Sequence, residues 1–209
     1  IDAACQVAQA ISTHEVRPDL DFFTAVDDLN TNEETGAGMM GIIEFNSACY
    51  YRYSLVDLAQ LTTNLQGGTE QAIKTVEAFI RASVAAIPSG KQTTMAAYNP
   101  PSLVKIKVID GGMPWSLSNA FASPIRVNSA QNDLTRISAQ RLIEYDQNLK
   151  DVYGSSHLRF DGMISLHEGM VEGNFDQLVS NVLNVLREQL WVGPFYCDLK
   201  APCSHGGPR

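Results

Sequence analysis

Residues 19–28 read DLDFFTAVDD, with two phenylalanines, an alanine and a valine held between pairs of aspartates. They lie in a longer segment, residues 13–41, that has no sustained apolar period and contains a proline and three glycines. Connections of this length are usually functional or disordered. Adjacent phenylalanines in polar surroundings need a surface to contact, so the segment predicts a functional loop that meets a partner.

The acidity of the chain is concentrated in and around this loop. The 209 residues carry 15 basic and 23 acidic side chains, a net charge of −8. Residues 1–60 hold ten of the acids and two of the bases, and the other 149 residues hold thirteen of each. An acidic protein is normally a poor candidate for contact with phosphates, which Lys and Arg provide. Because the whole excess lies in the first sixty residues, the rest of the chain is neutral.

Length and composition describe one folded domain, or one domain with an appendage. Apolar residues make up 44% and charged residues 18%, which excludes intrinsic disorder. No apolar run approaches about 18 residues and no basic leader precedes an apolar block, so neither a membrane span nor a signal peptide is predicted. The four cysteines have no framework spacing, which favours a reduced, cytoplasmic protein.

The pattern of apolar residues predicts an α+β fold with helices on one face of an antiparallel sheet, compatible with a split βαβ unit of the ferredoxin or RNA-recognition type. In residues 2–11 the spacing fits a helix better than a strand. The strands expected after residue 41 lie at 42–53, 93–98, 103–109 and 158–166. The expected helices run from Thr69 to Ile87, from Pro114 to Phe121 and over 134–152, where Gly154 closes the helix. A last helix runs to residue 190, and Asn174 and Gln177 form a capping box at its start.

Two further predictions concern charged side chains. Lys105 and Lys107 alternate with apolar residues in the strand at 103–109, so one face of that strand is expected to meet water. Glu144 and Asp146 are too close in sequence to share a helix face, and both are expected on the solvated surface.

No constellation of residues supports catalysis, and no cofactor is predicted. Gly90-Lys91 lacks the earlier glycine of a phosphate-binding loop, and His167-Glu168 lacks the second histidine of a zinc protease. Cys197, Cys203 and His205 lie within nine residues but include no C-x-x-C pair, so a bystander role is favoured over a zinc site. The sequence therefore predicts a protein that is not an enzyme and holds no metal.

Short motifs follow one another in order between residues 10 and 121: AISTHEV at 10–16, DLDFFTAVDDL at 19–29, EFNS at 44–47, YRY at 51–53, LAQL at 58–61, GKQ at 90–92, AAYNP at 96–100, MP at 113–114 and SNAF at 118–121. The series resembles the crRNA-binding backbone subunit of type I-E CRISPR Cascade complexes. The likeness is strong over roughly residues 2–126 and weak or absent after that. An ordered series of this kind is hard to obtain by chance.

The resemblance implies a non-catalytic protein that polymerises along guide RNA as a helical filament beside other Cascade subunits, with no membrane partner. It implies an RNA-recognition or ferredoxin-like palm with an antiparallel sheet, and a protruding thumb hairpin. Residues 1–13 lead into the thumb, 14–41 form the thumb loop, 42–190 the palm and 191–209 an irregular tail. For the first segment the resemblance implies a strand, which is preferred to the helix that the spacing indicates.

In such subunits the thumb lies across the guide and displaces every sixth nucleotide, so that the intervening bases can pair with invader DNA. An acidic loop cannot grip phosphates, but aromatic rings can wedge beside bases, and stacking contributes about 1–3 kcal/mol per base without sequence preference. A local hydrophobic cluster is the alternative reading of the two phenylalanines. The expected RNA-binding residues are Phe22, Phe23, Thr24, Val26, Lys91 and Gln92.

The sequence also departs from the pattern of this family. Roughly the first half of a family member, which would precede Ile1, is expected to be absent. A tryptophan common in relatives is Phe22 here, and an arginine after the Lys-Gln pair is Thr93, which leaves phosphate contact at that loop mostly to Lys91. Two other functions remain open: a protein-only module whose acidic loop docks on a basic partner, and a metal-dependent nuclease.

Overall fold

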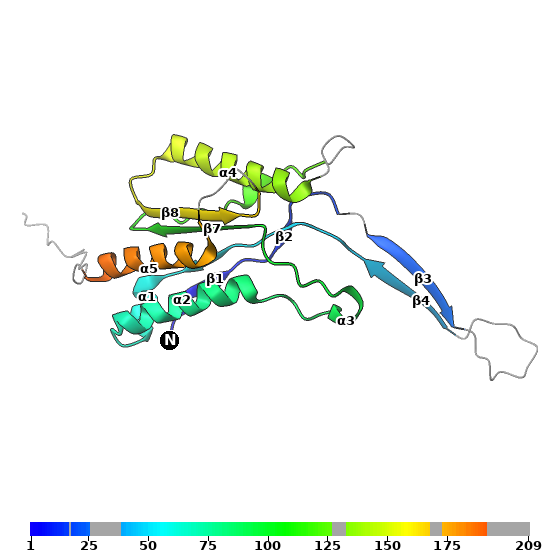
Figure 1. The fold of residues 1–209 in the computed structure, drawn as a ribbon, viewed down its shortest axis with the longest axis horizontal. Helices are drawn as coiled ribbons and strands as arrows, with labels where there is room; N and C mark the ends of the chain where they lie inside the picture. The colour runs from blue at the N-terminus through cyan, green and yellow to red at the C-terminus, as the bar shows by residue number, and fades with distance from the viewer. Residues whose placement is uncertain (17, 26–38, 127–132, 168–172, 192–209) are drawn as a thin grey trace, which may run out of the picture.

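The computed structural model describes residues 1–16, 18–25, 39–126, 133–167 and 173–191. A body of helices and strands carries a two-stranded hairpin that projects from it (Figure 1). Within the described ranges, no helix is both long and apolar enough to cross a membrane.

An antiparallel ribbon runs through the first sixty residues. The outgoing strands β1, β2 and β3 pair in turn with the returning strands β6, β5 and β4, so the chain leaves the body and comes back alongside itself. The outermost pair, β3–β4, is the projecting hairpin (Figure 1). The strands are β1 Cys5–Val7, β2 Ile11–Ser12, β3 Asp19–Ala25, β4 Met39–Phe45, β5 Tyr50–Tyr51 and β6 Ser54–Val56.

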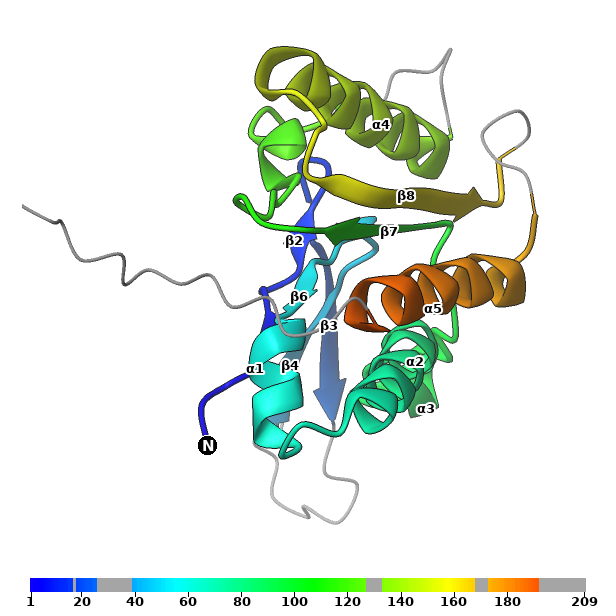
Figure 2. The ribbon, with the colours of Figure 1, turned by 90° about the vertical axis from the view of Figure 1, so that its left-hand side faces the viewer.

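The centre of the body is an antiparallel pair of strands, β7 (Leu103–Ile109) and β8 (Leu158–Ser165). Helices α2 (Thr69–Ala85) and α5 (Phe175–Trp191) lie on one side of this pair, and α4 (Leu134–Tyr153) lies on the other (Figures 1 and 2). The predicted mixture of helices and antiparallel strands is confirmed, but the helices cover both faces of the pair. Three short helices complete the body: α1 Leu58–Asn64, α3 Gln92–Met95 and the 3-10 helix η1 Ser118–Phe121.

The main core lies between α2, α5 and the strand pair. Ile73 of α2 and Val179 of α5 are 1% and 0% exposed, and they pack in one cluster with Val108 of β7. A second cluster joins η1 to α4 through Phe121 and Leu142. The apolar stripes of α2, α4 and α5 recur at helical spacing, which is why the sequence indicated all three helices.

The capping box predicted at the start of the last helix is confirmed. The backbone N–H of Gln177 donates to the side-chain oxygen of Asn174 over 2.9 Å, and the N–H of Asn174 donates to the side-chain oxygen of Gln177 over 3.1 Å. Both bonds lie within four residues of chain, so the motif forms without help from the rest of the fold.

The structure decides between the two interpretations of residues 2–11 and corrects one prediction about the ribbon. Residues 2–11 contain strands rather than a helix, in agreement with the resemblance, because they pair with the returning chain. The single strand predicted at 42–53 is divided into β4 and β5, because the chain leaves the ladder at residues 46–49.

Three boundaries in the body also differ from prediction. Residues 93–98 are not a strand. The side chain of Gln92 donates to the carbonyl oxygen of Pro88, and that of Thr94 donates to the carbonyl oxygen of Lys91. These local hydrogen bonds compete with extended structure. Gly68, not Thr69, is the N-cap of α2. The helix expected from Pro114 shortens to η1.

An open hollow of about 2840 Å³ is lined by residues of both β6 and β7. Its walls include both strands and apolar side chains of the three long helices, among them Val76, Leu142 and Val182. Within the described part of the chain, β6 pairs only with β1 and β7 only with β8. Each strand therefore has one edge without a neighbouring strand.

Candidate nucleic-acid interface

One face of the β3–β4 hairpin is apolar and exposed. The register places Phe22 opposite Ile42 and Leu20 opposite Glu44, so these four residues share a face. Leu20, Phe22 and Ile42 are 51%, 61% and 59% exposed. We call these three residues the hairpin face. Because large apolar side chains side by side on a projecting element are costly to leave in water, the hairpin face is suited to contact with a partner.

Alternation along the strand separates the acids from this face. Asp19 and Asp21 occupy the alternate positions of β3, on the side opposite to Leu20 and Phe22. Glu44 is the carboxylate within the register of the hairpin face. Asp19 and Asp21 therefore lie on the other side of the hairpin, and the ring of Phe22 can approach a base without bringing these two aspartates with it.

Of the other loop residues expected to contact RNA, two are among the described residues and one is not. Phe23 and Thr24 lie in β3, where their backbones pair with Gly41 and Met40. Val26 lies outside the described residues. The sequence argument missed Leu20 and Ile42, because their place beside Phe22 depends on how β3 and β4 are paired.

Lys91 lies at the base of the hairpin. Its Nζ donates to the carbonyl oxygen of Glu44 over 3.4 Å, and its backbone adopts the left-handed conformation at φ 57°. The structure thus brings Lys91 and the hairpin together, and the ammonium group is in an exposed setting where it can also reach a phosphate.

Gln92 has a different role within the same loop. Its side-chain Nε2 donates to the carbonyl oxygen of Pro88 over 2.7 Å and lies 3.4 Å from that of Ala97. The donor group of Gln92 is therefore used in holding the loop that presents Lys91.

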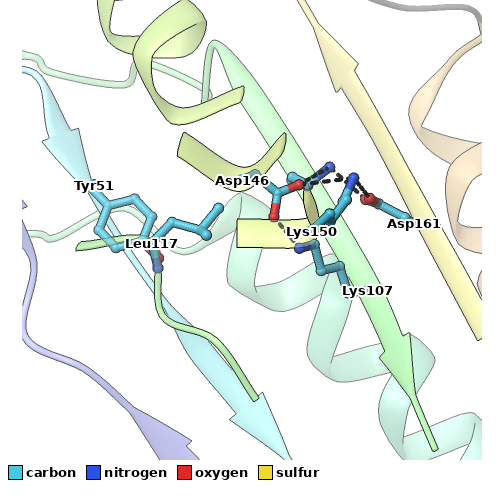
Figure 3. A network of polar contacts seen from close by, with 7 residues as sticks. Tyr51, Lys107, Leu117, Asp146, Lys150 and Asp161 are labelled. Carbon is cyan, nitrogen blue, oxygen red and sulfur yellow. Dashed lines mark hydrogen bonds and ion pairs between the residues drawn. The ribbon is translucent and has the colours of Figure 1, made fainter. Parts of the chain in front are cut away.

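A cluster of five charged side chains holds α4 against β7 and β8 (Figure 3). Asp146 of α4 is 2% exposed and lies 3.1 Å from the Nζ of Lys105 and 3.2 Å from that of Lys150. It is also paired with Lys107. Asp161 of β8 lies 2.5 Å from Lys105 and is paired with Lys150. The cluster joins three elements through alternating charges.

The cluster keeps Asp146 and Lys150 charged. Burial acts to raise the pKa of Asp146, but hydrogen bonds and charges from Lys107 and Lys105 outweigh burial and hold that pKa below its usual value. Burial acts to lower the pKa of Lys150, but Asp161 and Asp146 raise it above its usual value. Groups tuned in these directions do not exchange protons near neutral pH, so the arrangement is suited to structure rather than to acid–base chemistry.

Two predictions about these charges are therefore wrong. The face of β7 that carries Lys105 and Lys107 is covered by α4, and the two side chains are 11% and 15% exposed. Asp146 is buried, whereas Glu144 is exposed as predicted. The alternation of a strand shows which residues share a face, but it does not show what covers that face.

The described ranges do not bring a set of possible metal ligands together. They contain no group of three or more His, Cys, Asp or Glu side chains placed to hold a metal ion. Cys197, Cys203 and His205 lie outside these ranges.

Comparisons with known proteins give one family and similar solved chains. Residues 1–182 match the family described as CT1975-like protein. One similar solved chain, from a CRISPR RNA-guided surveillance complex in a pre-nicking state, has a TM-score of 0.75 and 28% identity, over 89% of this chain and 51% of that chain. Another, from a CRISPR RNA-guided surveillance complex, has a TM-score of 0.75 and 29% identity, over 88% of this chain and 70% of that chain.

The matches cover different shares of the two solved chains. The chain spans about half the length of the first of the two solved chains. No match was found among curated proteins.

Proposed function

This chain belongs to the family of CT1975-like proteins, and on that premise we propose that it is part of a guide-RNA-binding backbone subunit of a type I-E CRISPR Cascade complex. Its partners are the guide RNA, copies of itself along that RNA, other Cascade subunits and, through the guide, invader DNA. The proposed role is non-catalytic and cytoplasmic.

The observation that carries the proposal is the hairpin face on its projecting hairpin. An aromatic ring that is 61% exposed, flanked by two exposed aliphatic side chains, can stack on or wedge beside a base of any identity. Such contact does not read sequence, as a scaffold for many different guides requires. Lys91, beside Glu44 at the base of the hairpin, supplies a cation for the adjoining phosphate.

The proposal gives each segment a role. Residues 1–13 lead into the thumb, which displaces every sixth nucleotide of the guide. The thumb was expected to end at residue 41, but because β4 runs to Phe45 we place its end at residue 45, and the RNA-recognition-like palm follows to residue 190. Phe22, with Phe23, Thr24 and Val26 from the same loop, meets the displaced nucleotide. Lys91 contacts the backbone of the guide, and Gln92, which was expected to do the same, holds the loop that presents Lys91. Of the tail expected at 191–209, Trp191 ends α5 and the other residues lie outside the described ones.

A filter-binding titration with single-stranded guide RNA tests the proposal. Loss of one stacked ring in Phe22→Ala is expected to weaken RNA retention about 5- to 150-fold, the equivalent of about 1–3 kcal/mol. The matched control is Phe45→Ala, which removes the same side chain from the other face of the same hairpin, where Phe45 is 38% exposed. That control should retain RNA as the parent chain does.

The same titration separates the alternatives. Equal RNA retention by both variants and the parent chain would contradict the thumb assignment. A protein-only module that docks through Asp19 and Asp21 predicts no salt-dependent retention at all. A metal-dependent nuclease predicts cleavage of the RNA when Mg²⁺ or Mn²⁺ is added, whereas the backbone subunit leaves it intact.

A further inference from the structure

Three sequence motifs that take no part in the proposed RNA contact meet at one place in the fold. They are AISTHEV at 10–16, YRY at 51–53 and SNAF at 118–121. Their meeting point is the base of the ribbon, where the outgoing and returning chains part before the β3–β4 hairpin begins. We call the contacts described below the joint.

Thr13 connects three separate segments at the joint. Its N–H donates to the carbonyl oxygen of Cys49 on the returning chain over 2.9 Å, and its own carbonyl oxygen accepts from the N–H of Ile125 over 3.0 Å. Its hydroxyl oxygen lies 2.9 Å from that of Ser138 on α4. The residue is 2% exposed, so these bonds form in the interior of the protein.

The direction of the hydroxyl contact follows from proton counting. The hydroxyl of Ser138 donates to the carbonyl oxygen of Leu134 over 2.7 Å. Because a serine hydroxyl has one hydrogen, it can only accept from Thr13, and the threonine hydroxyl is the donor. Thr13 is therefore held in one orientation by groups on three segments of the chain.

Tyr51 forms the second half of the joint. Its hydroxyl oxygen accepts from the backbone N–H of Leu117 over 2.9 Å, in front of η1 (Figure 3). Its ring lies against Phe121, with 5.8 Å between ring centroids and 47° between planes. Leu117 and Phe121 are both buried, so Tyr51 anchors the returning chain to the smaller core.

The joint lies where the ribbon has no ladder of its own. Between the β2–β5 and β3–β4 pairs, the described residues 13–16 and 18 of the outgoing chain and 46–49 of the returning chain belong to no strand. His14 pairs instead with Ile125, in an isolated parallel bridge. Without a ladder across this gap, the angle of the hairpin depends on what holds the two chains just before it.

We propose that Thr13 and Tyr51 are positioning residues that fix the angle at which the β3–β4 hairpin leaves the body. They act through Ser138, Ile125 and Leu117 rather than by touching RNA. That the angle brings the hairpin face to a guide RNA rests on the proposed function. The angle itself is a property of the chain alone.

Distances between paired spin labels, measured without RNA, test the inference. The native cysteines are first replaced by serine, and labels are attached through Leu20→Cys on the hairpin and Asn148→Cys on α4, both exposed positions. Thr13→Val and Tyr51→Phe each remove a hydroxyl at nearly constant shape. Each is expected to broaden and shift the distance distribution between hairpin and α4.

A second label pair and a control variant separate positioning from general loosening. The pair Lys74→Cys and Asn148→Cys spans α2 and α4 within the body and should keep its distribution in both variants. Val179→Ala, which opens the main core away from the joint, should lower the melting temperature but leave the hairpin distribution unchanged.

Two results would overturn the inference: an unchanged hairpin distribution in both hydroxyl variants, or equal broadening of both label pairs. If Thr13→Val does not fold, Tyr51→Phe and Ser138→Ala decide the matter. Failure of RNA binding by the parent chain would remove the proposed function while leaving the joint intact, so the two outcomes are distinguishable.

Discussion

The ammonium group of Lys107 in β7 is ion-paired with the carboxylate of Asp146 in α4, 39 residues further along the chain. Asp146 is 2% exposed, and a carboxylate buried to that extent is stable only with charged partners and hydrogen bonds. The pair fixes which side of α4 meets the strands, and α4 in turn carries Ser138 of the joint. The charged cluster therefore supports the base from which the hairpin projects.

Removing the central carboxylate should be strongly destabilising. Asp146→Ala leaves Lys105 and Lys107 largely buried without their shared partner, and the expected loss of unfolding free energy is about 3–5 kcal/mol. Urea unfolding followed by circular dichroism measures it. Glu144→Ala, on the exposed side of the same helix, is the matched control and should change the value by less than about 0.5 kcal/mol. Similar small changes in both variants would show that the cluster adds little to stability.

The same carboxylate should make stability depend on acid pH. The pKa of Asp146 is lower in the folded chain than in the unfolded chain, so its contribution is complete above the unfolded value of about 4 and is lost as the pH falls through the folded value. The pKa of Lys150 is raised, so its contribution is complete below its unfolded value and is lost only at strongly alkaline pH.

Unfolding of the parent chain and of Asp146→Asn across a pH series checks this dependence. The difference in unfolding free energy between the two should be constant around neutral pH and should shrink below about pH 4. A difference that grows with acidity would contradict the direction of the pKa shift.

Loss of the capping box should cost a moderate amount of stability. Asn174→Ala removes the acceptor for the N–H of Gln177, and the expected loss is about 1 kcal/mol. Asn181→Ala, the same replacement at an exposed interior position of α5, should be neutral or slightly stabilising because alanine favours the helix. Thermal unfolding of the two variants should therefore move in different directions, and a common shift would argue against the cap.

Hydrogen exchange should distinguish the two edges of β7. The bond from the N–H of Leu166 to the carbonyl oxygen of Ser102 sets the alternation of the ladder, so the N–H of Ile106 faces β8 and those of Lys105 and Lys107 point toward the hollow. The two lysine amides are expected to exchange faster than that of Ile106, by on the order of 100-fold. Protection of all three amides in the isolated chain would mean that the free edge is covered.

Helices α5 and α4 show which structural features could be predicted from the sequence alone. For α5, the apolar stripe and the Asn174–Gln177 spacing predicted both the helix and its first hydrogen bonds, since all of these depend on residues within a few turns. For α4, the stripe predicted the helix equally well, yet the burial of Asp146 was missed because its partners Lys105 and Lys107 lie on another element.

The hairpin and the joint show the same difference between features set by nearby residues and features set by distant ones. The sequence by itself determined the helices with clear apolar stripes, β7 and β8, the capping box and, through its ordered motifs, the resemblance that pointed to a thumb at residues 14–41. Only the tertiary structure decided that Ile42 lies beside Phe22, that α4 covers the lysines of β7, and that Thr13 reaches Ser138 across 125 residues of chain. Periodicity and capping are set by neighbours along the chain, whereas register, coverage and buried hydrogen bonds are set by which distant surfaces come together.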